Sequence, residues 1–161
     1  MRKTVTPRAP GVATEATLNP IEVHLSGGMY ALNRFLMTLQ NKRMPVTSFA
    51  VGKDEHGMRA TVLLDCPPET ARRYTTLLSA LEDVQQIGAA SKLLEVALLK
   101  VRGNAWRESA AHAGVDAHEN GDTVVVVGEP KTLEAWLAEI KDDLEDFVRF
   151  GPVARPGDGK G

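Results

Sequence analysis

The sequence predicts an α+β fold in which the order strand-helix-strand-strand-helix-strand occurs twice in tandem. Two observations support this prediction. Residues 21–40 (IEVHLSGGMYALNRFLMTLQ) pass from the period-2 alternation of a strand to the spacing of a helix across two glycines. A second series of strand and helix patterns follows in the same order, and it contains Asn120-Gly121, a strong hairpin signal.

The first unit begins with a half-buried strand at Ile21–Leu25, after which Gly27 and Gly28 allow a tight turn. Amides at the start of the helix that follows carry partial positive charge and can hold a carboxylate. A plain strand-to-helix connection is the alternative interpretation. The helix is predicted at Met29–Gln40 because its apolar residues recur at helical spacing: Met29, Leu32, Phe35, Leu36 and Leu39.

The rest of the first unit is predicted to be a hairpin, a helix and a strand. The hairpin strands are Val46–Val51 and Met58–Leu64, joined by a polar turn at Lys53–Gly57. A short strand at Val84–Ile87 ends the unit. The helix starts at Pro67-Pro68-Glu69, where proline and an acid are tolerated, and its expected buried stripe is Tyr74, Leu77, Leu78 and Leu81.

The second unit repeats this order. Its four strands are predicted at Glu95–Arg102, Val115–His118, Thr123–Val127 and Asp146–Ala154. Its first helix is Ala105–Ala113, which Gly114 ends. Its second helix starts at Pro130, and one face is expected to hold Leu133, Trp136, Leu137, Ile140 and Leu144.

Units of this order are ferredoxin-like βαββαβ folds, so we expect two of them in tandem. The expected divisions are a flexible tail at 1–19, a first domain at 20–90, a second domain at 91–156 and a flexible tail at 157–161. Each small core leaves one sheet face and its edges uncovered, which favours pairing with another copy. We therefore expect a homodimer through the first domain, with strand Ile21–Leu25 or helix Met29–Gln40 at the interface.

Composition excludes several classes of protein. A net charge of −2 and an aromatic content of 5% give no basis for binding nucleic acid. The single cysteine, Cys66, excludes an internal disulfide framework and fits a reducing compartment. No apolar run is long enough for a membrane span, and no signal peptide is visible, so a cytoplasmic protein is expected.

Sites for catalysis, metals or cofactors are not evident. The spacing of the histidines and Cys66 does not match a zinc site, and each histidine is expected at the surface: His24, His56, His112 and His118. Ser26 lies in HLSGG, but His24 stands where a nucleophile elbow needs glycine. No phosphate loop, dinucleotide fingerprint or paired-carboxylate motif is present, so no cofactor is expected.

An acidic run lies near the end of the second unit's last helix, and it comprises Asp142-Asp143 and Glu145-Asp146. We interpret it as a solvated helix end, although acids near a helix C-terminus are mildly unfavourable. A metal or partner site is the alternative. With no catalytic set visible, the chain is expected to be a binding or regulatory module.

Four segments, ALNRFLMTLQNKRMPVTSFAV, LSALEDVQQI, LLEVALLKV and FVRFGPVAR, together with the order of elements, resemble the regulatory small subunit of acetohydroxyacid (acetolactate) synthase. The resemblance covers about residues 21–156. It implies that the first unit is an ACT domain, and that the chain is a non-catalytic subunit. Such a subunit binds and activates the thiamine-diphosphate-dependent large subunit and confers feedback inhibition by a branched-chain amino acid, usually valine.

In that family the amino acid lies between two ACT domains of a dimer, at the turn between the first strand and helix. The resemblance places the turn at Gly27-Gly28-Met29-Tyr30-Ala31, with Pro45 and Val46 as further candidate ligand-binding residues. Three positions depart from the pattern. Gly27 replaces an asparagine or aspartate, Tyr30 replaces a glycine, and Lys42-Arg43-Met44-Pro45 replaces arginine-glycine-aromatic-asparagine. The second unit's first helix is also shorter than the family's.

These departures lead to a hypothesis about the effector. If Tyr30 points inward, its ring fills the volume that an amino-acid side chain needs, and Pro45 lacks an N–H donor, so valine binding is weak or absent. If Tyr30 points to solvent, its hydroxyl helps to bind a different ligand. Two other functions stay open, a free-standing ACT-type amino-acid sensor or effector domain with another partner, and a small enzyme on the same fold.

Overall fold

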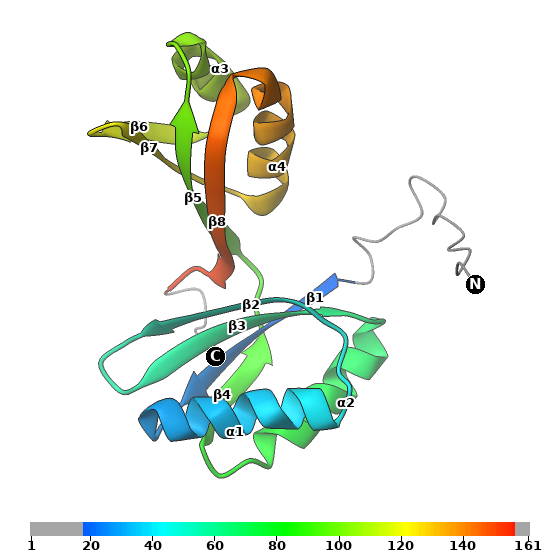
Figure 1. Ribbon diagram of the computed structural model, residues 1–161. Coiled ribbons are helices and arrows are strands. Elements are labelled where there is room, and N and C mark those ends of the chain that lie inside the picture. Colours follow the sequence, from blue (N-terminus) through cyan, green and yellow to red (C-terminus); the bar gives the residue numbers. More distant parts are fainter. Residues whose placement is uncertain (1–17, 157–161) are drawn as a thin grey trace, which may run out of the picture.

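The computed structural model describes residues 18–156 as two βαββαβ units, one above the other (Figure 1). This arrangement confirms the predicted α+β class with two tandem ferredoxin-like units. The first unit consists of β1 (Leu18–Leu25), α1 (Gly28–Asn41), β2 (Val46–Lys53), β3 (Met58–Asp65), α2 (Pro68–Ser79) and β4 (Val84–Ala89). The second consists of β5 (Leu93–Val101), α3 (Ala105–Ala113), β6 (Asp116–Asn120), β7 (Thr123–Gly128), α4 (Pro130–Glu139), the 3-10 turn η2 (Lys141–Asp143) and β8 (Leu144–Ala154).

Each unit has one four-stranded antiparallel sheet with both helices on the same face (Figure 1). The strand orders are β2-β3-β1-β4 and β6-β7-β5-β8, so the first strand of each unit is interior. The face without helices is called here the open face. Among residues 18–156, no helix is both long and apolar enough to cross a membrane.

Each sheet packs a separate hydrophobic core against its helices. In the first unit, Val23, Leu25 and Leu64 are buried under Phe35 of α1 and Leu78 of α2. The second core is centred on Trp136 of α4 and Trp106 of α3. Three predicted core residues are instead exposed, because the buried stripes of their helices run through neighbouring positions: Met29, Leu36 and Leu77.

Two predicted boundaries are wrong. Leu18 and Asn19 were assigned to the tail, but they belong to β1, where Leu18 pairs with Asp65 and the Asn19 amide donates to the carbonyl oxygen of Cys66 at 2.6 Å. Leu144 was assigned to the last helix, but α4 ends at Glu139 and Leu144 starts β8 opposite Val101. The expected tails at 1–17 and 157–161 lie outside the described residues.

The units meet where the end of β8 reaches the open face of the first sheet. The Ala154 amide donates to the Thr61 hydroxyl at 2.9 Å, and the Ser48 hydroxyl donates to the carbonyl oxygen of Gly151 at 2.9 Å. Thr61 is only 5% exposed as a result. Residues 90–92 link β4 to β5 beside this contact. The junction therefore combines a covalent link with two side-chain-to-backbone hydrogen bonds.

Candidate functional site

The predicted effector turn is a left-handed connection between β1 and α1. Gly27 and Gly28 have φ angles of +97° and +64°, which side chains rarely adopt. A side chain on Gly27 would also approach the Cβ atom of Ala31 to 3.2 Å. Gly27 is the N-cap of α1 and offers no side chain to the first amides of the helix. Both glycines are therefore favoured by the backbone, and Gly27 also by the atoms crowded behind it.

An ion pair behind the turn was not predicted from the sequence. The Ser26 amide donates to the carbonyl oxygen of Asp83 at 2.9 Å, which ties the end of β1 to the start of β4. The Asp83 side chain accepts from Arg34 Nε of α1 at 2.6 Å. The hydrogen bond from Arg34 holds the pKa of Asp83 below its usual value. A Cβ atom on Gly27 would be 3.4 Å from Asp83 Oδ1, so a charged carboxylate lies next to the turn.

A small cavity of about 120 Å³ lies at this place, between the ion pair and the apolar residues Leu25, Ala31 and Phe35. Neither Arg34 nor Asp83 is among the site residues predicted from the sequence. The pairing joins residues 49 positions apart, and neither helical nor strand spacing predicts it. The sequence points to Arg34 and Asp83 only through the family resemblance, because each lies within one of the segments that resemble the family.

Tyr30 points to solvent, with 80% of its surface exposed, and so does Met29, at 68%. In a single chain the Tyr30 ring therefore lies outside the core, and the hypothesis that it fills the ligand volume between two copies stays a prediction. An αL turn at Gly27 and Gly28 directs the first helical turn so that Ala31, not Tyr30, faces the core, where it is fully buried.

Pro45 and Val46 lie at the other end of α1 from the glycine turn. A helix of 14 residues is about 20 Å long at 1.5 Å per residue, and β2 starts only after it ends. The Pro45 carbonyl accepts from the Asp65 amide at 2.9 Å, and Val46 pairs with Leu64. One protomer therefore does not bring the predicted ligand-binding residues together.

An apolar stripe runs along the outer face of α1. Met29, Leu36 and Met37 are 68%, 39% and 50% exposed. Their spacing places them with Asn33 and Gln40 on one side of the helix. β2 is the neighbouring edge strand, and its Val51 is 45% exposed. These exposed residues of α1 and β2 are together called here the α1–β2 face.

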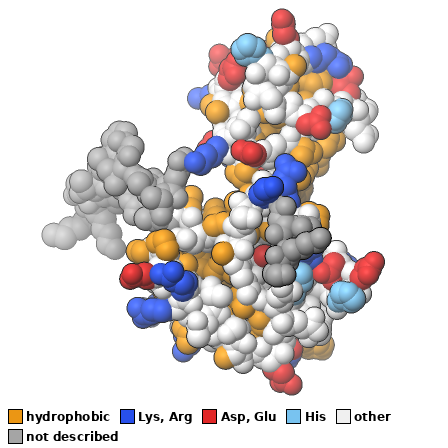
Figure 2. All heavy atoms as spheres, turned by 180° about the vertical axis from the view of Figure 1, so that it is seen from behind, with side chains coloured by type: hydrophobic (Ala, Val, Ile, Leu, Met, Phe, Trp, Pro, Cys, Tyr) orange, Lys and Arg blue, Asp and Glu red, His pale blue; other side chains and the backbone are white. Residues whose placement is uncertain are grey.

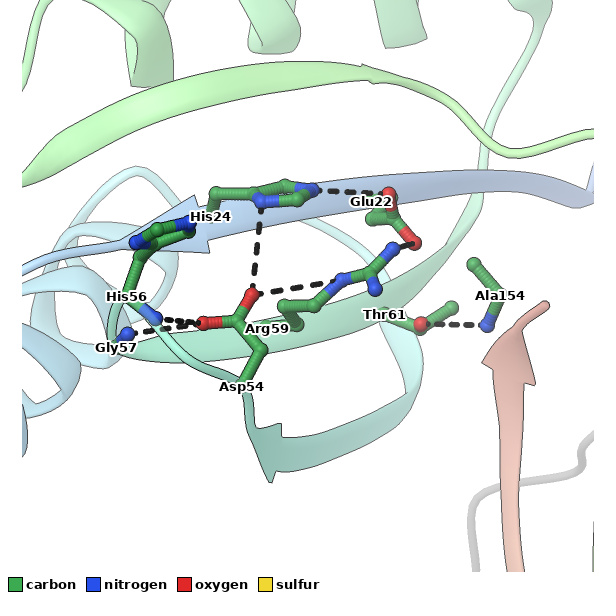
Figure 3. Close-up of polar contacts among 8 residues, drawn as sticks. All are labelled: Glu22, His24, Asp54, His56, Gly57, Arg59, Thr61 and Ala154. Carbon is green, nitrogen blue, oxygen red and sulfur yellow. Dashed lines mark hydrogen bonds and ion pairs between the residues drawn. The ribbon is translucent and has the colours of Figure 1, made fainter. Parts of the chain in front are cut away.

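A polar cluster on the first sheet's open face contains two predicted surface histidines, His24 and, through its backbone amide, His56 (Figure 3). Glu22 accepts from Arg59 at 2.9 Å and lies 3.0 Å from His24 Nε2. Asp54 accepts from the amides of His56 and Gly57, and the hydrogen bond from His56 is the main cause of its lowered pKa. These contacts fix the β2–β3 turn against β1. No three His, Cys, Asp or Glu side chains in residues 18–156 are placed to hold a metal ion.

The other candidate residues have structural surroundings. His112 is exposed, and His118 lies 2.8 Å from Asp116 at the surface. Cys66 is buried, which raises the pKa of its thiol. The acidic run is not a helix end, because Asp142 and Asp143 belong to η2, and the Arg102 amide donates to the carbonyl oxygen of Asp143 at 2.8 Å. Glu145 faces Arg102 at 3.7 Å.

No protein-family model and no curated protein matches this sequence. Among solved structures, the small subunit of acetolactate synthase from Thermotoga maritima is similar to this chain. The TM-score is 0.72 and the identity is 15%, over 86% of this chain and 96% of that chain. At this identity the match shows the fold alone, and the fold is that of the family which the sequence segments resemble.

A solved structure described as an unknown protein from Galdieria sulphuraria also matches, with a TM-score of 0.40 and 16% identity over 85% of this chain and 99% of that chain. A TM-score this low supports no argument about this chain.

Proposed function

We propose that this chain is a non-catalytic regulatory subunit that binds and activates the large, thiamine-diphosphate-dependent subunit of an acetohydroxyacid synthase. The observation that carries the proposal is the tandem arrangement of two βαββαβ units, which aligns with 96% of the T. maritima small subunit. The short segments that resemble the family are distributed over both units, which agrees with a likeness of the whole chain and not of one unit.

The proposed assembly is a homodimer through the α1–β2 face. β1 lies between β3 and β4, so both of its edges are already paired and it offers no free edge to a second copy. The α1–β2 face instead offers the edge strand β2 and the exposed α1 residues Met29, Leu36 and Met37. A two-fold axis across this face is the simplest closed arrangement that covers it.

The dimer also bears on the effector site. Two α1 helices that pack antiparallel across a two-fold axis place the glycine turn of one copy beside Pro45 and Val46 of the other. The two separated groups of predicted ligand-binding residues then form one site. In this site an amino-acid carboxylate would meet the Asp83 carboxylate, which Arg34 keeps charged. We therefore propose that valine binds weakly or not at all.

The subunit role is tested by co-purification of the full chain with the large synthase subunit of the same organism, followed by turnover measurements. We expect a complex, and a higher turnover at saturating small subunit than for the large subunit alone. Failure to form a complex overturns the subunit assignment. A complex whose turnover equals that of the large subunit alone overturns the activator role.

The effector proposal is tested by titration calorimetry with valine, leucine and isoleucine. We expect wild-type valine affinity to be weak, and Asp83→Asn to strengthen it, because the repulsion between carboxylates is removed. Asp122→Asn in the exposed β6–β7 turn is the matched control and leaves the affinity unchanged. Wild-type binding of valine at tens of micromolar, about −6 kcal/mol, contradicts the proposal.

A further inference from the structure

β8 forms an exposed edge of the second sheet, because its only strand neighbour among residues 18–156 is β5. It is 11 residues long, and its side chains Phe147, Val148 and Phe150 are 50%, 46% and 52% exposed. Figure 2 shows that hydrophobic side chains reach the surface of the second unit down to its junction with the first. The unpaired N–H and C=O groups of such an edge can accept a further strand, and proteins usually protect them.

The other sheet edges are better protected than β8. β6 has only five residues, and four of them are exposed and polar. β4 has six residues and exposes Gln85 and Gln86. β2 ends with the exposed Lys53 and belongs to the α1–β2 face. In β8 the one cation, Arg149, does not protect the edge, because its Nε lies 2.5 Å from Oε2 of Glu95 on β5.

Apolar side chains of β8 lie on both sides of the sheet. Phe147 pairs with Leu99, whose side chain is in the core, so Phe147 lies on the side that carries the helices. Phe150 pairs with Val96 and lies on the open face. Phe147 stays exposed because α3 and α4 pack mainly against β5, β6 and β7. A helix or a second sheet would cover only one of these sides, whereas an added strand covers both and also pairs with the free edge.

The acidic run lies at the start of this edge. Asp142 and Asp143 of η2 are exposed, and Asp146 pairs with Lys100 at the beginning of the regular β5–β8 ladder. Glu145 lies 3.9 Å from Lys100, whereas no cation of residues 18–156 lies within ion-pair distance of Asp142 or Asp143. Because opposite charges favour pairing across strands and interfaces, a basic residue is favoured at this end of an added strand.

We propose that β8 accepts an extended segment of the large synthase subunit as an additional strand of the second sheet. The segment has apolar side chains on both of its sides and a basic residue next to the acidic run. Backbone hydrogen bonds hold it on the free edge, Phe147 contacts it on one side of the sheet, and Val148 and Phe150 contact it on the other. This inference rests on the proposed function, because that function supplies the partner. It leaves the α1–β2 face free for the homodimer.

A second copy of the chain fits this edge less well. In antiparallel self-pairing, the register that sets Val148 opposite Phe150 of the second copy also sets the two Arg149 side chains opposite each other, and like charges so placed are destabilising. The register centred on Val148 instead sets Asp146 opposite Phe150. Phe150→Thr is therefore expected to leave the homodimer unchanged in sedimentation. Loss of the homodimer in this variant overturns the proposal, because a second copy then occupies the edge.

The main test measures the affinity of the full chain for the large synthase subunit of the same organism by titration calorimetry. Phe147→Thr and Phe150→Thr each remove apolar surface from one side of β8, and threonine suits an exposed strand. Each variant is expected to weaken the complex about tenfold. Leu77→Ala on α2, where Leu77 is 48% exposed, is the control and is expected to bind as wild type.

Each outcome of this test decides a separate point. If neither phenylalanine variant weakens the complex, this inference is wrong and the proposed function stands. If only Phe150→Thr weakens it, the partner packs on the open face, and the added strand is wrong. If the wild-type chain forms no complex, the proposed function and this inference fall together.

The basic residue of the segment is tested separately. Asp142→Asn/Asp143→Asn is expected to weaken the complex and to make its affinity less sensitive to salt. Asp116→Asn/Asp122→Asn is the matched control, since it changes two exposed aspartates at the opposite edge of the same sheet. Equal affinity in the two double variants overturns the role of the acidic run.

Amide hydrogen exchange provides a measurement without variants. The amides of Asp146–Phe150 that point away from β5 are expected to exchange rapidly in the free wild-type chain and slowly in its complex with the large subunit. Unchanged exchange at these amides overturns the added strand, even if the phenylalanine variants weaken binding.

Discussion

The two units share a topology and a backbone hydrogen bond, but they differ in what their side chains add to it. In the first unit the Ser26 amide donates to Asp83 O at 2.9 Å, and in the second the Arg102 amide donates to Asp143 O at 2.8 Å. Both bonds tie the end of the first strand to the residues before the last strand. In the first unit Arg34 also binds the Asp83 side chain, whereas in the second Arg102 faces Glu145. The fold thus fixes the backbone bond, and the side chains distinguish the turns.

The open faces differ even more. That of the first sheet carries the polar cluster of Glu22, His24, Asp54 and Arg59 (Figure 3). The open face of the second sheet is apolar, because register pairs β5 with apolar residues of β7 and β8: Val96, Leu98, Val125, Val127, Val148 and Phe150. The first unit exposes apolar surface on a helix and the second on a sheet. One topology therefore presents two different kinds of contact surface.

The largest effect is expected from breaking one core while leaving the other intact. Phe35 is 1% exposed and packs against Phe49 in the first unit, so Phe35→Ala should cost about 4 kcal/mol of unfolding free energy. Both tryptophans of the chain, Trp106 and Trp136, lie in the second unit. The midpoint of urea unfolding followed by circular dichroism should therefore shift to a lower urea concentration. The midpoint followed by tryptophan fluorescence should stay unchanged.

This experiment also tests the division into domains at 20–90 and 91–156, which stays a prediction. If the fluorescence transition moves together with the dichroism transition, the two units unfold as one, and the contrast between two independent cores is wrong. Leu77→Ala on α2, a residue that is 48% exposed, is the control and should shift neither transition appreciably.

The second unit has a buried carboxylate on its first strand, whereas the first unit has none on the corresponding strand. Glu95 is 3% exposed and accepts from Arg149 Nε at 2.5 Å across β5 and β8. Removing one partner of a buried pair leaves an uncompensated charge. Arg149→Leu is expected to destabilise the second unit by about 3 kcal/mol. Tryptophan fluorescence in urea should report this loss directly.

Two controls separate this loss from a general effect of removing arginine. Arg107→Leu breaks an ion pair with Glu119 in which both side chains are half exposed, so its cost should stay below about 1 kcal/mol. Glu95→Gln/Arg149→Leu removes both charges and should recover most of the stability. A cost for Arg149→Leu as small as that for Arg107→Leu would falsify the assignment of a buried pair.

Much of the fold can be predicted from short-range sequence patterns, but the differences between the two units cannot. The glycine turn, the α3 helix at Ala105–Ala113 and the Asn120-Gly121 hairpin were predicted, because periodicity and turn chemistry are local. The boundary at Leu18 was missed because proline and asparagine are rare in strands, and pairing with β3 overrides that preference. The start of β8 at Leu144 was missed because Leu144 still falls at helical spacing from the apolar residues of α4, although η2 lies between them.

The candidate site was predicted only in part, since its important contacts join distant segments. The backbone of Gly27 and Gly28 is readable from the sequence, but the Arg34–Asp83 pair depends on packing of α1 against the α2–β4 connection. The orientation of Tyr30 likewise depends on which face of α1 meets the sheet.

A smaller effect is expected from testing which unit forms the dimer. Met37→Asp places a charge on the α1–β2 face, where Met37 is 50% exposed, so the monomer should fold normally. We expect the dissociation constant measured by sedimentation to rise about tenfold or more, which corresponds to about 1.4 kcal/mol. Phe150→Asp is the matched variant on the second sheet's open face, and Phe150 is 52% exposed. If Phe150→Asp dissociates the dimer and Met37→Asp does not, the interface belongs to the second unit.

The smallest effect concerns the Arg34–Asp83 ion pair behind the first turn. The hydrogen bond from Arg34 keeps the pKa of Asp83 below the ordinary value of about 3.9, so the charged carboxylate is favoured in the folded state. The resulting stabilisation is present above the unfolded pKa and is lost as pH falls through the folded pKa. Because the Arg34 side chain is 60% exposed, water screens the pair and the effect stays small.

Arg34→Met should therefore lower the urea midpoint, followed by circular dichroism, at pH 6. The gap to wild type should close as pH falls below 4. Arg72→Met on α2 is the control and should show no such pH-dependent gap. A gap for Arg34→Met that persists unchanged to the acid limit would mean that Arg34 stabilises the turn by packing and not by charge.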